Sequence, residues 1–162
     1  MEWVIDILLK LISHLPKIIS FWLYSPGRTK KNIEVFVSAQ EGTVEVWCDK
    51  YQSQFNIILD VRNNNPFPIE VDRVEATGYI HSASMKAIDL FGVEIKAHQK
   101  ANIFLRGRID AANLEQINQV PDDETLRLEA KAVIVNKYHN IRDYIHRYDR
   151  LVCKYYNKQK QK

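Results

Sequence analysis

The feature that most constrains the fold is a change in the spacing of apolar residues at Ile33. Before this residue, apolar side chains recur every three or four positions, as on one face of a helix. After it they alternate with polar ones, as on a strand: residues 33–37 come first and residues 44–48 follow, with the turn signal Glu41-Gly42 between them. The pattern predicts a β domain that begins near Ile33 with a two-stranded hairpin.

Four further alternating segments predict additional strands. They cover residues 55–61, 69–80, 101–109 and 126–134, and the second changes phase near Asp72–Arg73, which predicts a β-bulge. Asp110 is a suitable N-cap for a short helix over 111–119. A chain of 162 residues can bury a substantial core. We therefore predict a mainly β, immunoglobulin/fibronectin-III-like β-sandwich over residues 33–140.

The first 25 residues have the pattern of an amphipathic helix. The polar residues form a narrow stripe, with spacings of three and four, at Glu2, Asp6, Lys10, Ser13, Lys17, Ser20 and Tyr24. Pro16 lacks the amide that would bond to the Ile12 carbonyl, which predicts a kink or a split there. Three placements of the apolar face stay open: in the plane of a membrane interface, in a span or oligomeric bundle, or against its own domain.

A basic linker over residues 26–32 follows this helix. Aromatic residues near the helix ends, followed by cations, are typical of a membrane-interface anchor. The formal net charge is +3, distributed as an acidic body between two basic ends. The residues expected to contact a membrane surface or an apolar partner helix are Trp3, Leu8, Leu11, Ile12, Leu15, Ile19, Trp22, Arg28, Lys30 and Lys31.

The segment 141–162 is basic and rich in tyrosine. Its apolar residues recur at three and four, which favours a helix with a basic tail, whereas an alternating reading leaves neither face clearly apolar. Tyrosines such as Tyr144 and Tyr148, beside Arg142, Arg147 and Arg150, suit single-stranded nucleic acid. The same cations suit anionic lipid, and the same tyrosines suit simple packing on the sandwich.

The strand ending in Asn63-Asn64-Asn65-Pro66-Phe67-Pro68 and the segments after it carry a family resemblance. Together with the later strand 101–109, the short helix and the strand 126–134, the sequence resembles the water-stress and hypersensitive-response (WHy) domain of atypical late-embryogenesis-abundant proteins over roughly residues 43–136. The most specific match is Asn65, Pro66, Phe67 and Pro68, where that family carries its Asn-Pro signature. The resemblance implies a fibronectin-type sandwich, often behind a membrane anchor, and a role in desiccation or stress protection, or in envelope or defence functions.

Two departures limit this resemblance. The family's Gly-rich turn before the late strand is reduced to Gln99-Lys100, and the C-terminal Tyr/Lys/Arg-rich segment has no counterpart.

Catalytic and metal-binding patterns are not found in the sequence. His139 and His146 are seven positions apart, too far for the i, i+4 pair of a helical zinc site, and no nucleophile, phosphate-loop or dinucleotide motif occurs. We expect no enzymatic activity, catalytic residue, metal site, cofactor or small-molecule substrate. Cys48 and Cys153 are expected as reduced, buried thiols, with a single pairing as the alternative.

Two functional hypotheses remain. The preferred one is a non-enzymatic, membrane-associated interaction or stress-protection module that contacts a membrane surface, an apolar partner helix or another protein. Because no signal peptide is recognised, its globular domain is expected on the cytoplasmic side. The alternative is a cytosolic nucleic-acid-binding protein that uses the basic C-terminus.

Overall fold

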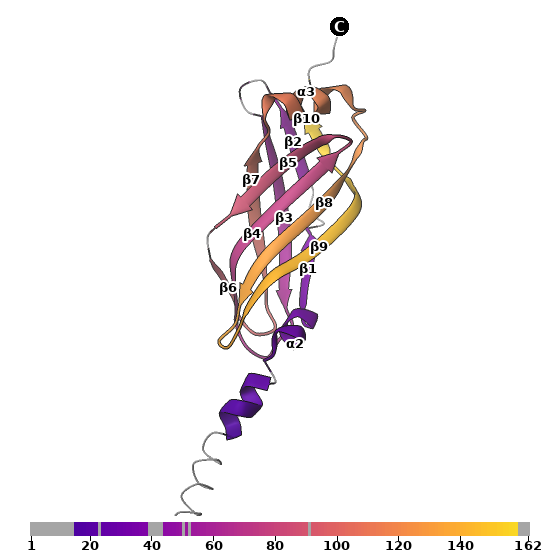
Figure 1. The fold of residues 1–162 in the computed structure, drawn as a ribbon. Helices are drawn as coiled ribbons and strands as arrows, with labels where there is room; N and C mark the ends of the chain where they lie inside the picture. Colours follow the sequence, from indigo (N-terminus) through magenta and orange to yellow (C-terminus); the bar gives the residue numbers. More distant parts are fainter. Residues whose placement is uncertain are drawn as a thin grey trace, which may run out of the picture.

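The computed structural model describes residues 15–22, 24–38, 44–49, 51, 53–90 and 92–158. Figure 1 shows two β-sheets packed face to face in an elongated domain, with a helical segment (15–22) leading away from one end. Four of the predicted membrane-contacting residues (Trp3, Leu8, Leu11 and Ile12) lie outside the described residues, as does the carbonyl of Ile12 in the kink prediction. The mainly β sandwich is confirmed.

The first sheet is built around one long strand. Its members are β1 (Ile33–Val37), β2 (Val44–Cys48), β3 (Ser53–Asn63), β7 (Lys100–Arg108) and β10 (Lys154–Tyr156). β7 runs antiparallel along one edge of β3, while β1 and β2 share the other edge, and β10 adds to β2 in parallel. Along most of β3, buried residues alternate with partly exposed ones, so one face of this strand packs into the core.

The predicted hairpin of residues 33–37 and 44–48 is wrong. β1 pairs with residues 59–63 of β3 and β2 pairs with residues 53–57, so the two strands lie end to end. An alternating pattern identifies a strand and its buried face, but it does not identify the partner. β3 has 11 residues, and β1 and β2 have five each. Both short strands can therefore pair with β3 along their full length. The turn signal Glu41-Gly42 lies outside the described residues.

The second sheet repeats this plan around β4. Its members are β4 (Ile69–Ile80), β5 (Ala83–Asp89), β6 (Val93–Ile95), β8 (Thr125–Val135) and β9 (Asn140–Val152). β5 and β6 share one edge of β4, β8 pairs with the other, and β9 lies beyond β8. The predicted bulge is confirmed, because the register between β4 and β8 shifts between Val71 and Arg73. The extra residue lets Val71 and Val74 both face the core.

Two short helices lie at opposite ends of the sandwich (Figure 1). The predicted helix is confirmed as α3 (Ala111–Gln119), where the Asp110 carboxylate accepts a hydrogen bond from the Asn113 amide at 2.9 Å. At the other end the predicted linker contains α2 (Pro26–Lys31), which begins with Pro26 at a position where its missing amide costs nothing.

The predicted helix over residues 141–162 is wrong for the described part of that segment, which forms β9 and β10. Two bulges in β9 explain the helical spacing. Ile141 and Tyr144 face Ile134 and Ala132, and Tyr148 and Leu151 face Leu128 and Leu126, so three steps on β9 twice match two on β8. The residues that face the core therefore recur at spacings of three, four and three, which is also the spacing of a buried helix face.

The two sheets approach each other closely where β5 crosses β7. A Cβ atom added at Gly107 would lie 1.9 Å from the carbonyl oxygen of Lys86. Only a residue without a side chain fits at this contact, so Gly107 lets the two edge strands close one side of the sandwich.

Candidate functional site

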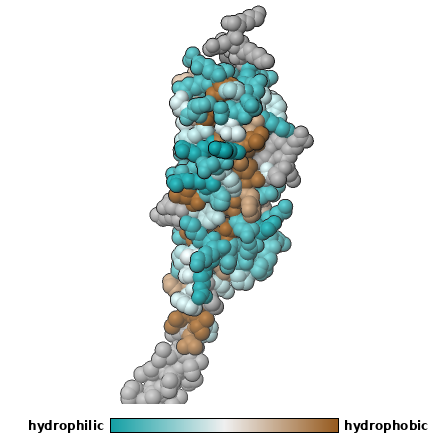
Figure 2. All heavy atoms as spheres, turned by 90° about the vertical axis from the view of Figure 1, so that its right-hand side faces the viewer, coloured by the Kyte–Doolittle hydropathy of each residue, from teal (hydrophilic) through white to brown (hydrophobic). Residues whose placement is uncertain are grey.

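The helical segment 15–22 exposes an apolar surface. Its exposed fractions are 49% for Leu15, 59% for Ile18, 49% for Ile19, 56% for Phe21 and 65% for Trp22. Figure 2 shows this surface as a brown zone at the lower end of the molecule. Of the predicted membrane contacts, Leu15, Ile19 and Trp22 belong to it, and Ile18 and Phe21 extend it. None of the described helices combines the length and the hydropathy needed to cross a bilayer.

Aromatic contacts connect this segment to the sandwich. The rings of Phe21 and His139 lie 4.5 Å apart, measured between centroids. Tyr24 packs edge-on against Phe67 at 4.3 Å and stacks on Tyr138 at 4.8 Å. Phe67 lies between β3 and β4, and Tyr138 and His139 lie between β8 and β9, so Tyr24 contacts two turns at the same end of the domain.

Next to these aromatic residues lies a group of buried polar side chains that we call the amide cluster: Thr29, Asn63, Asn65 and Asn136. The Asn136 amide nitrogen donates to the Thr29 hydroxyl at 3.0 Å and to the Tyr24 carbonyl at 3.3 Å. The Asn136 amide oxygen accepts from the backbone amides of Tyr138 and His139 at 2.8 and 2.7 Å. Buried polar groups are costly unless they are hydrogen-bonded, and the segment before β1 supplies both partners of the Asn136 nitrogen.

The other half of the cluster includes Asn65, the first residue of the Asn-Pro-Phe-Pro turn. Asn63 donates from its side chain to the carbonyl of Phe67 at 2.8 Å and accepts from the Asn65 backbone amide at 3.0 Å. Asn65 in turn donates to the Thr29 carbonyl at 3.3 Å. Pro66 and Pro68 are exposed and Phe67 is half-buried. The Asn-Pro-Phe-Pro turn therefore packs against α2 and Tyr24.

The sequence reasoning missed three members of the amide cluster: Thr29, Asn63 and Asn136. A local signal existed for Asn136, because an Asn just after a strand often accepts from backbone amides two and three residues later. Thr29 carries no such signal. Its role depends on two turns that are distant in the sequence.

The basic residues of α2 point in different directions. The Arg28 guanidinium lies 4.1 Å from the centroid of the Trp22 ring, and the Lys30 ammonium lies 5.5 Å from that of Tyr144. Arg28 and Lys31 are three positions apart, on one side of the helix. They line a groove of about 360 Å³ with Tyr24, Asn32, Asn65, Pro66 and Phe67. Lys30 does not line this groove.

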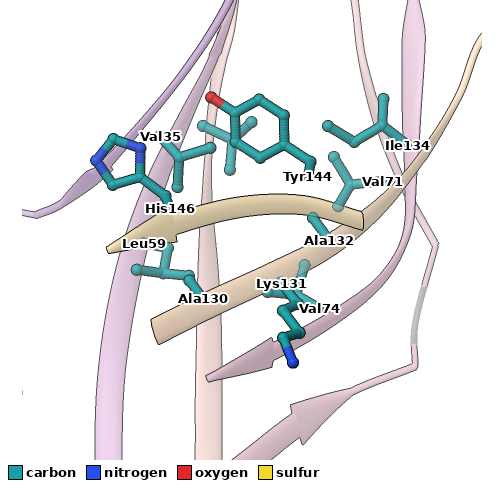
Figure 3. A pocket seen from close by; sticks show the side chains of 11 residues that line it. Val35, Leu59, Val71, Val74, Ala130, Lys131, Ala132, Ile134, Tyr144 and His146 are labelled. Atoms are coloured by element: carbon teal, nitrogen blue, oxygen red, sulfur yellow. The ribbon is translucent and has the colours of Figure 1, made fainter. Parts of the chain in front are cut away.

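A second cavity lies between the sheets and is too small to be a binding site (Figure 3). Its volume is about 10 Å³, and its lining includes Val35, Leu59, Val71 and Tyr144. That space corresponds to about one water molecule, and the walls have almost no polar surface. In Figure 3 the ammonium of Lys131 extends away from the apolar side chains, and it pairs with Glu129 at 3.2 Å.

The tyrosines of β9 belong to the fold. The hydroxyl groups of Tyr144 and Tyr148 donate to the carbonyls of Ile33, at 2.9 Å, and Val35, at 2.5 Å. The Ser38 amide donates to the carbonyl of Ile58 in β3. In this register the backbone amides and carbonyls of even-numbered β1 residues point toward β3, and those of odd-numbered residues point away from it. The two tyrosines thus cover the outer edge of β1, and burial raises the pKa of each hydroxyl. Neither hydroxyl is available to a ligand.

Both cysteines are free, buried thiols, as expected from the sequence. Burial raises the pKa of Cys48 to about 11 and that of Cys153 to about 12. Thiols with raised pKa values are poor nucleophiles at neutral pH, so these two are structural. Among the described residues, no group of three or more His, Cys, Asp or Glu side chains could hold a metal ion.

Comparison with known proteins gives structural similarity only. No protein-family model matches the chain, and no curated protein matches it. A crystal structure of a protein from Archaeoglobus fulgidus is similar with a TM-score of 0.46 at 11% identity, covering 72% of this chain and 91% of that one. A solution structure assigned provisionally to the late embryogenesis abundant proteins is similar with a TM-score of 0.43 at 11% identity, covering 93% and 90%.

Proposed function

We propose that this chain is a non-enzymatic interaction module held at a membrane surface by its N-terminal segment. The observation that carries the proposal is the apolar surface of residues 15–22, where five large side chains are 49% to 65% exposed. Such contiguous apolar surface is typical of a site that is covered by another apolar phase.

The composition around this surface favours lipid as that phase. Trp22 combines a broad apolar ring with a polar N–H, and aromatic residues of this kind concentrate at membrane interfaces. Arg28 and Lys31 follow Trp22 on the next helix, α2, and supply cations that suit lipid phosphates. Moving five half-exposed side chains into the interface contributes about 1 kcal/mol each, which is enough for reversible membrane binding.

A stress-protection role is part of the same proposal. It is supported by the resemblance of the Asn65-Pro66-Phe67-Pro68 turn to the signature of the atypical late-embryogenesis-abundant proteins. In this chain the turn packs on Tyr24 and on α2, so its contribution is to fix the N-terminal segment to the sandwich. The free thiols of Cys48 and Cys153 support a reducing, cytoplasm-facing location for the sandwich.

Vesicle flotation with the full chain tests the membrane proposal. We expect the wild-type protein to float with phosphatidylcholine vesicles containing phosphatidylglycerol, and the Ile18→Ser/Trp22→Ser variant to float at least tenfold less. The matched control is Phe104→Ser/Val152→Ser, which removes side chains that are 69% and 80% exposed on the sandwich. This control should float like the wild type.

Two results would contradict the proposal. One is equal flotation of the wild type and the Ile18→Ser/Trp22→Ser variant. The other is a wild-type chain that self-associates through residues 15–22, as seen by light scattering, and does not float. In that case the apolar surface is covered by a protein partner.

A further inference from the structure

The groove beside α2 has the features of a binding site for a phosphate ester. We infer that this groove, lined by Arg28, Lys31, Asn32 and Phe67, binds the headgroup phosphate of an anionic phospholipid. The inference rests on the proposed membrane association, and it adds a specific lipid contact to the general attraction of an apolar helix for a bilayer.

The size and lining of the groove fit the polar part of a phospholipid. Its volume of about 360 Å³ lies within the range of small-molecule sites, about 300 to 1,000 Å³. One wall consists of Phe67 and Tyr24, packed edge to face at 4.3 Å, and Pro66 extends it. The cations Arg28 and Lys31 and the amides of Asn32 and Asn65 complete the lining. Cations beside an apolar wall suit a phosphate attached to a glycerol unit.

The two cations are not neutralised by the rest of the described chain. Elsewhere several cations have carboxylate partners, such as Lys86 with Glu75 at 3.0 Å and Lys158 with Asp122 at 3.3 Å. Among the described residues no carboxylate pairs with Arg28 or Lys31. Positive charge therefore collects at the junction between the sandwich and the apolar segment, where an anion would be attracted.

Arg28 also contacts the apolar segment. Its guanidinium lies over the Trp22 ring, with 4.1 Å between the central carbon and the ring centroid. A guanidinium carries five N–H donors, and phosphate accepts such donors in pairs. Because Trp22 is 65% exposed on the apolar segment, a phosphate held by Arg28 lies next to the surface proposed to enter the lipid.

The groove wall is held in place without a ligand. The Asn32 side chain donates to the Asn65 side-chain oxygen at 3.4 Å, and Asn65 is fixed by Asn63 at 3.0 Å. A preformed wall loses little conformational freedom on binding, which favours affinity. The amide cluster therefore supports the groove as well as the junction.

Lys30 provides a control on the same helix. It has the same charge as Lys31 and is the adjacent residue, but its ammonium lies over the Tyr144 ring and it does not line the groove. A non-specific electrostatic attraction to the anionic bilayer would depend on both lysines equally. A binding groove would use Lys31 and not Lys30.

The experiment measures the partition of the full chain onto two kinds of vesicle. One is pure phosphatidylcholine and the other contains 30 mol% phosphatidylglycerol, and the ratio of the two partition coefficients is the anionic preference. We expect Lys31→Gln to lower this preference about fivefold, because the groove loses one of its two cations, and Lys30→Gln to leave it within a factor of two. Circular dichroism and unfolding curves verify that both variants fold.

A soluble probe separates a lipid headgroup from a free phosphate. Titration with glycerol 3-phosphate, followed by NMR at the side-chain amides of Asn32 and Asn65, should shift these signals in the wild type and in Lys30→Gln but not in Lys31→Gln. Equal loss of anionic preference in both lysine variants would overturn the groove. Shifts with glycerol phosphate but no anionic preference on vesicles would overturn the lipid as the ligand.

Failure of the membrane proposal gives a different result. If the Ile18→Ser/Trp22→Ser variant binds pure phosphatidylcholine as well as the wild type does, the apolar segment is not the anchor. The groove is judged separately, by the difference between Lys31→Gln and Lys30→Gln on the anionic vesicles.

Discussion

The side-chain amide of Asn136 donates to the hydroxyl oxygen of Thr29 across 3.0 Å, joining residues that are 107 positions apart. Asn136 follows β8, and Thr29 lies on α2, just ahead of the first strand. Because the Thr29 carbonyl also accepts from Asn65, one residue of α2 is bonded to two separate turns. This relationship fixes the N-terminal segment to the sandwich.

The run of three asparagines at 63–65 offers an internal comparison. Asn63 is fully buried and its side chain is bonded on both ends, whereas Asn64 is exposed. We expect Asn63→Ala to lower the free energy of unfolding by about 2 kcal/mol, because the carbonyl of Phe67 and the amide of Asn65 lose their partner. Asn64→Ala should change it by less than about 0.5 kcal/mol. Urea unfolding of the three proteins measures both values, and equal effects would contradict the assigned network.

Replacement of Asn136 should loosen the junction more than the sandwich. We expect Asn136→Ala to speed hydrogen exchange at the Thr29 amide, which bonds to the Ser25 carbonyl at 3.0 Å, while amides in the middle of β3 keep their protection. Exchange measured by mass spectrometry or NMR tests this. Uniformly faster exchange over the whole chain would show instead that Asn136 stabilises the entire domain and not the junction.

Gly107 and Gly27 form a second matched pair. A Cβ at Gly107 would meet the Lys86 carbonyl oxygen, whereas a Cβ at Gly27 meets nothing within 4 Å. Gly107→Ala must separate β5 from β7, and we expect a loss of about 3 kcal/mol in the free energy of unfolding. Gly27→Ala lies in α2 and should be neutral or stabilising by about 0.5 kcal/mol, since alanine restricts the unfolded chain. Thermal or urea unfolding would rank the two variants, and similar losses would contradict the close crossing.

The Tyr148 hydroxyl should make stability fall at high pH. Burial raises its pKa from the usual value of 10.0 to about 12. A group whose pKa is higher in the folded state contributes stability that is complete below about pH 10 and is lost as the pH rises towards 12. We expect the free energy of unfolding to decline over this window and to decline less steeply in Tyr148→Phe. Tyr51→Phe, at a side chain that is 89% exposed, should keep the wild-type slope.

Urea unfolding at several pH values from 8 to 11.5 gives the required slopes. If Tyr148→Phe and the wild type lose stability with the same slope, burial against β1 does not raise the pKa of the Tyr148 hydroxyl.

The strands were predictable because their alternation is local, but their partners were not. Residues 53–63 and 69–80 show their buried faces directly in the sequence, and the phase change at Asp72–Arg73 predicts the bulge. Pairing depends on long-range geometry, so the hairpin of residues 33–48 was wrong. In β9 two bulges change the spacing of inward residues to that of a helix, and nothing within that segment distinguishes the two cases.

The candidate site was predicted in part, for the same reason. The exposed side chains of Leu15, Ile19 and Trp22 continue a helical stripe that is visible in the sequence. The groove beside α2 required the turn at Asn65–Phe67 to lie against Arg28 and Lys31, which are more than 30 positions away. The distinction between Lys30 and Lys31 follows from the position of Tyr144 and from the lining of the groove.

The bonds of Thr29 also determine how the domain carries mechanical load. Tension on residues 15–22 reaches α2 and divides there between the β3–β4 turn, through Asn65, and the β8–β9 turn, through Asn136. Turns that belong to both sheets therefore share the force at α2, before it reaches the first residue of β1. A pull on the N-terminal segment therefore acts first on the hydrogen bonds of Thr29.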